Sequence, residues 1–214
     1  MIPNTHPQTL CVKKADDFEV SGTGSSPLWG KTKWIPLKRV KGEAAYETRF
    51  KILYSNKGIY CLYFCEDSKI TSTLKKDFTD LFNEDVVEAF FWPDESCPVY
   101  FEYELSPYNF ELPILVPNNN GDFYGWLPWH YEGDRKTRHA TQIVEEGKPK
   151  SWTAEFFVPF ELLKPLQNVP PKKGTRWRAN FYRIDYDFEP TYYSWEPIDQ
   201  HFHEFEKFGV IEFD

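Results

Sequence analysis

Apolar and polar residues alternate along most of the chain, and this two-residue period indicates β-strands that bury one face. The clearest run covers residues 46–54, where Phe50 and Ile52 alternate with Arg49 and Lys51. A turn sequence at residues 56–58 follows it, so this run and the next are expected to form a hairpin. Strands are predicted at residues 46–54, 59–66, 85–92, 99–105, 138–144, 151–158, 176–185, 191–195 and 207–213.

Helical patterns are scarce. Residues 159–164 begin with a proline, which suits the first turn of a helix, and they predict one or two helical turns. Residues 79–83 predict a short 3₁₀ turn. Many short strands with Gly- and Pro-rich connections favour an all-β fold: a single-domain antiparallel β-sandwich of two sheets, jelly-roll or immunoglobulin-like, with one or two short helical turns. The domain is expected to cover residues 1–214, with residues 1–40 packing on it.

Aromatic residues are unusually abundant, at 19% of the chain, with 19 Phe, 13 Tyr and 8 Trp. Such residues favour strands and dominate cores. Trp152 shares a predicted strand face with Phe156, and Trp177 shares one with Phe181. We therefore expect Trp152, Trp177 and Trp195 to lie in or near the core.

The charge balance excludes some classes of partner. The chain carries 25 Lys and Arg against 33 Asp and Glu, a net charge of −8. Because no basic run exceeds three residues, no nucleic-acid partner is expected. No apolar run approaches the ~20 residues that span a bilayer, so no membrane partner is expected either. Residues 1–10 lack a continuous apolar stretch, and no signal peptide is expected in this sequence.

Two of the four cysteines stand close together in the sequence, at Cys61 and Cys65. Because both fall in a predicted strand, their Cα atoms should be roughly 13 Å apart, too far for a disulfide or a shared metal ion. We expect them to be small buried thiols.

Known catalytic motifs are absent from the sequence. It has no Gly-x-Ser-x-Gly elbow, no Gly-rich phosphate loop and no His-Glu-x-x-His zinc motif. His201 and His203 could face one way as metal ligands, but spacing suggests no third ligand and their aromatic flanks favour packing. Glu88, Glu102 and Glu104 could supply the carboxyl pair of a glycosidase, although any acidic sandwich offers such pairs.

Aromatic rings in a long loop are a stronger functional signal. The longest irregular stretch, residues 117–134, contains Trp126 and Trp129, and loops of this length are often functional. Exposed aromatic rings stack on the apolar C–H faces of sugars. The alternative is that the two tryptophans close one end of the core, since most Trp side chains are largely buried.

Several short motifs follow one another in a recognisable order. Residues 58–67 read GIYCLYFCED and residues 81–91 read LFNEDVVEAFF. Later motifs are WTAEFFVPF at 152–160, WRANFYR at 177–183, SWEP at 194–197 and FG at 208–209. Their order and spacing resemble those of the family 9 carbohydrate-binding modules, over about residues 46–213.

The resemblance implies a β-sandwich and non-catalytic binding of an oligo- or polysaccharide, such as xylan or glucan, in polysaccharide breakdown. Family members often occur attached to xylanases and are usually secreted or periplasmic. Two alternatives stay open: a structural or protein-interaction sandwich that has lost sugar binding, and a xylanase-like glycosidase component. With 214 residues, the chain cannot hold a catalytic barrel of ~250 residues beside the sandwich.

The resemblance also implies a binding cleft. Family members hold a sugar chain end between two tryptophans, while polar side chains bind the hydroxyls. Phe82 takes the place of the first tryptophan, and Phe202 is the nearest match to the second. Glu88 corresponds to the family's glutamate. We therefore expect two phenylalanine rings to flank the sugar and Glu88 to accept its hydroxyl hydrogen bonds.

Other polar positions of that cleft differ from the family pattern. Glu102 and Glu104 stand where the family has an arginine and an asparagine, and Tyr182 aligns near its glutamine. Losing the arginine adds negative charge, which disfavours an anionic ligand such as a uronic acid. Trp126 and Trp129 form the alternative site.

No cofactor is expected, apart from structural calcium, which family members can carry. Acidic residues cluster at Glu66 and Asp67 and again at Glu84 and Asp85. Calcium prefers several oxygen ligands, so these pairs are the candidate positions.

Overall fold

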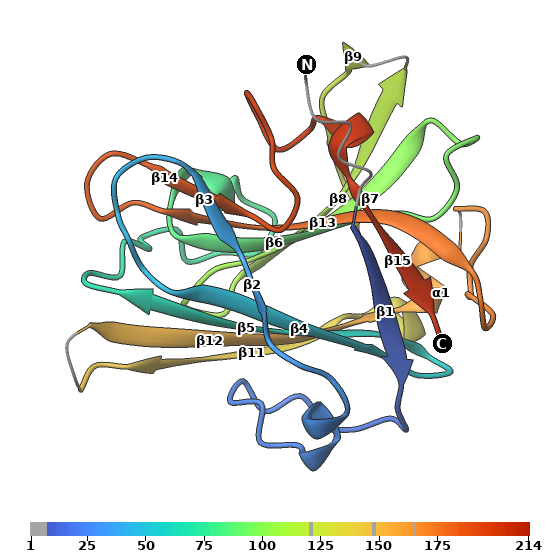
Figure 1. Cartoon of the computed structure of the whole chain (residues 1–214), viewed down its shortest axis with the longest axis horizontal. Helices are drawn as coiled ribbons and strands as arrows, with labels where there is room; N and C mark the ends of the chain where they lie inside the picture. Colours follow the sequence, from blue (N-terminus) through green and yellow to red (C-terminus); the bar gives the residue numbers. More distant parts are fainter. Residues whose placement is uncertain (1–7, 120–121, 147–148, 165) are drawn as a thin grey trace.

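The computed structural model describes residues 8–119, 122–146, 149–164 and 166–214, and shows two β-sheets packed face to face (Figure 1). Residues 1–7 of the N-terminal segment and residues 120–121 of the predicted loop lie outside the described residues. Within the described residues, the chain has fifteen strands and one α-helix, α1 (Phe160–Leu163), and no helix long and apolar enough to cross a membrane. Short 3₁₀ turns occur at Pro27–Lys31, Leu81–Asn83, Gly133–Arg135 and Phe205–Lys207. The predicted all-β fold is confirmed.

The first sheet carries the candidate site. Its spatial order is β10, β8, β7, β6, β13, β15, with β9 paired to β8 and β14 placed between β13 and β3. The strands are β10 (Leu127–Pro128), β9 (Asp122–Phe123), β8 (Glu111–Asn119), β7 (Val99–Leu105), β6 (Val86–Trp92), β13 (Arg176–Asp185), β15 (Gly209–Phe213), β14 (Thr191–Ser194) and β3 (Lys38–Lys41).

The second sheet has the order β4, β5, β12, β11, with β2 paired to β4. Its strands are β4 (Thr48–Tyr54), β5 (Gly58–Asp67), β12 (Lys150–Pro159), β11 (Arg138–Val144) and β2 (Ile35–Pro36).

One strand, β1 (Thr9–Lys14), connects the two sheets. Its first four residues pair with β15, its last two pair with β4, and both pairings are parallel. The sandwich was expected to be antiparallel throughout. Because β1 is joined to neither neighbour by a hairpin, no tight turn forces it to run antiparallel to them. The remaining strand pairs described are antiparallel.

The period-two pattern located most of the strands. Runs 99–105, 138–144 and 176–185 coincide with β7, β11 and β13, and the other six predicted runs differ from the observed strands by one or two residues at an end. The pattern missed β1, β2, β3, β9 and β10. It also missed β8, whose sequence contains Pro113 and Pro117, because proline argues against a strand interior. As a result, residues 117–134 do not form one irregular loop: they begin in β8 and include β9 and β10.

The main core lies between the two sheets. Trp152, Trp177 and Trp195 are 0%, 1% and 3% exposed, which confirms the prediction that they are core residues. Cys61 and Cys65 are buried and unpaired, also as predicted.

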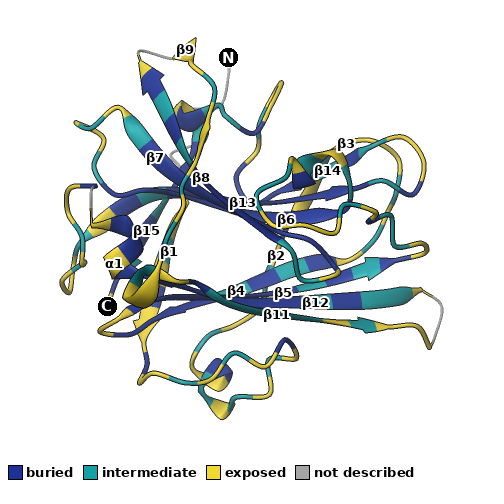
Figure 2. Cartoon of the chain, turned by 180° about the vertical axis from the view of Figure 1, so that it is seen from behind, coloured by how far each residue is buried: buried dark blue, intermediate teal, exposed yellow. Residues whose placement is uncertain are grey.

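A second cluster covers the outer face of the first sheet. All residues of β6 are buried, on both faces of the strand (Figure 2). On the outer side, Phe90 and Tyr182 pack against Phe202 and Phe208 from the segment that precedes β15. This segment, residues 198–208, forms a cover over the sheet and leaves room beside it for a cavity.

Candidate functional site

Three glutamates lie on the outer face of β6 and β7. Ala89 and Phe91 point into the main core, and side chains alternate along a strand, so Glu88 points outward. The same alternation on β7 turns Glu102 and Glu104 outward. Glu88 stands directly opposite Glu104 in the antiparallel pairing. Like charges in that position destabilise a sheet, so this pair of glutamates does not contribute to the stability of the fold when both are ionised.

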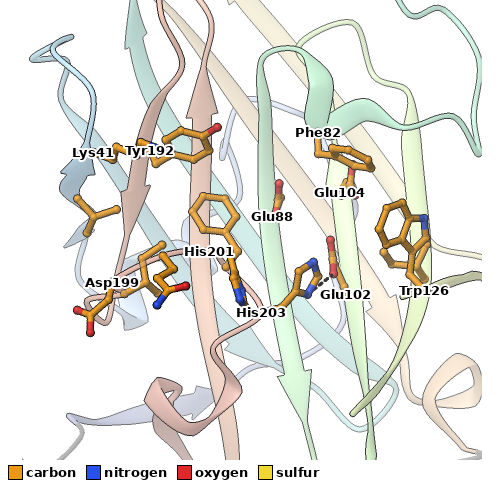
Figure 3. A pocket seen from close by; sticks show the side chains of 15 residues that line it. Lys41, Phe82, Glu88, Glu102, Glu104, Trp126, Tyr192, Asp199, His201 and His203 are labelled. Carbon is orange, nitrogen blue, oxygen red and sulfur yellow. Dashed lines mark ion pairs between the residues drawn. The ribbon is translucent and has the colours of Figure 1, made fainter. Parts of the chain in front are cut away.

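A cavity of about 220 Å³ lies over these glutamates. Figure 3 shows the three carboxyl groups between His201 on one side and Phe82 and Trp126 on the other. The cavity is bounded by strands β6, β7 and β8, by residues 198–203 of the cover segment and by Lys41 and Tyr192.

The three carboxyl groups are almost completely removed from solvent. Glu88, Glu102 and Glu104 are 2%, 3% and 0% exposed. Oxygens of each one, including both oxygens of Glu104, have no hydrogen-bond partner among the described residues. Burial raises the pKa of Glu88 to about 8. Burial, together with the charge of Glu88, raises the pKa values of Glu102 and Glu104 well above their usual range.

No strong cation balances this cluster. In the described part of the chain, the nearest basic group is His203, whose Nδ1 lies 3.8 Å from Oε2 of Glu102. The same Nδ1 forms a 2.7 Å hydrogen bond with the hydroxyl of Tyr100. Burial, reinforced by the charge of His201, lowers the pKa of His203 to about 4, so its ring is neutral near pH 7.

Two arginines of β13, the strand that pairs with β6, are engaged away from Glu88. Arg183 is fully buried on the inner side of the sheet and binds Asp67 and Asp185. Arg178 binds the carboxylate of Glu95 and two backbone carbonyls. Neither arginine therefore pairs with Glu88.

Aromatic rings surround the carboxyl cluster. Phe82 meets Trp126 edge to face, with ring centroids 5.3 Å apart. Trp126 is 37% exposed and Phe123 beside it is 38% exposed, so both rings present accessible faces. On the other side, Phe202 stacks flat on Tyr182 at 4.0 Å. The cavity thus combines apolar faces with buried oxygen acceptors.

The structure brings most of the predicted site residues together. Five residues predicted from the family resemblance line this cavity: Phe82, Glu88, Glu102, Glu104 and Phe202. Trp126, from the alternative site in the loop, lines it as well. Tyr182 lies behind Phe202 and donates its hydroxyl hydrogen bond to the Phe202 carbonyl oxygen at 2.9 Å. Trp129 lies elsewhere: it packs against the main core and donates to the carbonyl of Leu162 at 3.0 Å.

Other lining residues were not predicted as binding residues. His201 and His203 had been noted only as candidate metal ligands, and both line the cavity. Lys41 and Tyr192 come from two paired strands, β3 and β14, whose meeting at this cavity no local sequence pattern indicates. Asp199 and Gln200 belong to the cover segment.

Family models identify the chain. The model described as carbohydrate family 9 binding domain-like matches residues 20–168, and the model described as carbohydrate-binding family 9 matches residues 133–213. This protein belongs to carbohydrate-binding family 9. Carbohydrate binding is therefore the function class of the domain.

Solved structures share the fold of this family 9 domain. A candidate carbohydrate-binding protein from Bacteroides uniformis is 19% identical, covers 97% of this chain and 100% of its own, and gives a TM-score of 0.79. A family 9 module from Caldicellulosiruptor kristjanssonii in complex with cellotriose is 13% identical, with coverage of 97% and 94% and a TM-score of 0.70. The same organism's module in complex with glucose is 14% identical, with coverage of 97% and 96% and a TM-score of 0.67.

A curated relative is described as an extracellular protein of Arthroderma benhamiae. It is 25% identical over 146 residues, which are 64% of this chain. The match spans 63% of the length of that relative.

A second acidic cluster lies at the opposite side of the first sheet from the cavity glutamates. Asp67, Asp185 and Asp187 are buried, and one oxygen of each lies within 4.8 Å of the others. Arg183 contacts Asp67 at 2.9 Å and also Asp185. Burial raises the pKa of Asp67 to about 8, although the charge of Arg183 acts to lower it. The donor set fits a hard cation such as calcium.

Only one of the four residues predicted for calcium belongs to this trio. Asp67 does, whereas Asp85 accepts backbone N–H groups of Thr71 and Tyr186 beside it. Glu66 accepts the backbone N–H of Glu47, and Glu84 accepts that of Leu74.

Proposed function

We propose that this protein is a non-catalytic binding module whose outer-face cavity holds the end of an oligo- or polysaccharide of the glucan or xylan class, in the context of polysaccharide breakdown. The observation that carries the proposal is the meeting of accessible aromatic rings and buried carboxyl acceptors in one cavity. A sugar presents the matching pair of surfaces, an apolar C–H face and a rim of hydroxyl groups. The structural relatives in complex with cellotriose and glucose support the same class of ligand.

The aromatic set favours modest affinity. Phe82 and Phe202 offer smaller rings than tryptophan, and Phe202 already stacks on Tyr182. Dissociation constants in the millimolar to micromolar range, about −4 to −8 kcal/mol, are therefore expected.

The test is a glycan array covering neutral, acidic and amino-bearing oligosaccharides, followed by calorimetric titration of the sugars that bind. Trp126→Ala should weaken binding at least tenfold. Trp34→Ala is a matched control, because Trp34 is similarly exposed, at 36%, but packs beside Phe64 on the second sheet. Binding to none of the glycans, or equal loss in the two variants, would overturn the proposal. Chromatography of the titrated sugars checks the glycosidase alternative, which requires shorter products.

A further inference from the structure

The carboxyl cluster of the cavity is built without its counter-charge. Glu88, Glu102 and Glu104 are each at least nine-tenths buried, and each turns at least one unpartnered oxygen to the cavity (Figure 3). Among the described residues, no Lys or Arg nitrogen lies within 4.0 Å of them. Burying ionised carboxylates in this way would cost several kcal/mol, so these acids keep their protons until a cation pairs with them.

The spacing of the carboxyl groups argues against a bare metal ion. Among the described residues, only Asp67, Asp185 and Asp187 bring three possible ligand atoms within 4.8 Å of one another. The three cavity glutamates do not converge in that way. They spread along two strands beneath aromatic rings, which suits a larger organic cation.

We propose that the cavity selects a sugar bearing a protonated amino group, such as the end of an amino-substituted glucan built of glucosamine units. This inference rests on the proposed function and names the substrate class of the same site. An ammonium group carries three N–H donors and one positive charge, so it can form an ion pair with one carboxylate and leave donors for another unpartnered oxygen and for solvent. The pyranose ring that carries it can stack on Trp126 and Phe82. A uronic acid would instead bring a further carboxyl group and no positive charge to these oxygens.

The release of a proton on binding distinguishes an amino sugar from a neutral sugar. Crowding and burial keep the glutamates largely protonated before binding. A free amino group with a pKa near 8 is mostly protonated at pH 6.5. When the ammonium enters, at least one glutamic acid must lose its proton to form the ion pair, so binding releases roughly one proton to the buffer. A neutral sugar gives no such release.

Other titratable groups face the carboxyl cluster from the cover segment and from strands β3, β7, β13 and β14. The cover segment contributes Asp199, His201 and His203, and β3 and β14 contribute Lys41 and Tyr192. Tyr100 and Tyr182 pack behind the carboxyl groups from β7 and β13. His203 is neutral above pH 6.5, and burial holds the pKa of Tyr100 and of Tyr182 above the usual range. The ammonium of Lys41 lies 5.5 Å from the centroid of the Tyr192 ring.

The experiment compares three oligosaccharide series of equal length by titration calorimetry at pH 6.5, in buffers of different ionisation enthalpy. The series are glucosamine oligomers, the corresponding N-acetylated oligomers, and cello-oligosaccharides. The glucosamine series should bind at least tenfold more tightly than the other two and release roughly one proton. Its affinity should rise from pH 5 to pH 7, because the glutamates ionise more easily.

Charge-removing variants sharpen the test. Glu88→Gln and Glu104→Gln keep the side-chain shape and should each lower affinity for the glucosamine series at least tenfold. Glu161→Gln, on the exposed side of α1, removes the same charge away from the cavity and should change nothing. Equal or tighter binding of cello-oligosaccharides, without proton release, would overturn this inference and leave the proposed function standing. Failure of all three series to bind would overturn both.

Discussion

At the residue scale, buried acids of this chain fall into two kinds. Glu111 is 1% exposed, yet it accepts hydrogen bonds from Tyr103 and Thr137 and lies 3.5 Å from His139. These partners hold its pKa below the usual range, despite burial. Glu88 is buried to a similar extent without such partners, and its pKa rises to about 8. Burial with hydrogen-bond partners and burial without them therefore go with opposite shifts in the pKa of these two glutamates.

Replacing Glu88 by glutamine should make the protein more stable at alkaline pH. The folded protein holds this proton up to about pH 8, whereas an unfolded glutamate releases it near 4.5. Stability therefore falls as pH rises through that window, by about 1.4 kcal/mol per pH unit for each such group. His203, with a lowered pKa, acts in the opposite direction, but only below 6.5.

Urea unfolding at pH 6.5 and pH 8 isolates the glutamate effect. The wild type should lose more stability between the two values than Glu88→Gln does, while Glu161→Gln should follow the wild type. Parallel losses in wild type and Glu88→Gln would show that Glu88 is ionised in the folded protein throughout.

At the scale of elements, most of the strands could be predicted from the sequence, whereas the cavity could not. The alternation in residues 176–185 predicts β13 directly, because successive side chains of a strand point to opposite faces. The strand β8 was not predicted, because its two prolines are more typical of a loop. Nothing local shows that residues 198–208 fold back over β6, since that packing depends on partners more than a hundred residues away. Only the resemblance to family 9 indicated that Phe82 and Phe202 would approach Glu88.

One hydrogen bond between the cover segment and β13 can be removed by a single variant. Tyr182 donates to the carbonyl oxygen of Phe202 at 2.9 Å, and the two rings stack. Tyr182→Phe keeps the ring and leaves this carbonyl without its partner, so the free energy of unfolding should fall by about 1–3 kcal/mol. Because Tyr182 lies behind the cavity lining, sugar affinity measured well below the melting temperature should change less than threefold.

Tyr192→Phe is the matched control for that experiment. Tyr192 lines the cavity, and its hydroxyl has no hydrogen-bond partner among the described residues, so its loss should cost little stability. If Tyr182→Phe lost affinity while keeping its full stability, Tyr182 would be a ligand contact instead of a support for the cover segment.

At the scale of the whole molecule, buried acidic side chains form two clusters. The cavity glutamates lie on the outer face of the first sheet, whereas Asp67 of β5 and Asp185 of β13 meet between the two sheets, with Asp187 beside them. The two clusters differ in geometry: the aspartate oxygens converge within 4.8 Å, whereas the glutamates spread along a cavity wall. Convergence suits an inorganic ion, and spreading suits an organic one.

Calcium should raise the melting temperature of the protein through the aspartate trio. If the ion binds only the folded state, a concentration 100-fold above its dissociation constant adds about 2.7 kcal/mol, or roughly 5–10 °C for a chain of this size. Scanning calorimetry with millimolar calcium and with a chelator measures the shift. Asp187→Asn should abolish it, whereas Asp16→Asn, which removes an exposed acid, should retain it. An identical melting temperature under both conditions would mean that the trio binds no calcium, and that Arg183 together with a proton on Asp67 balances its charge.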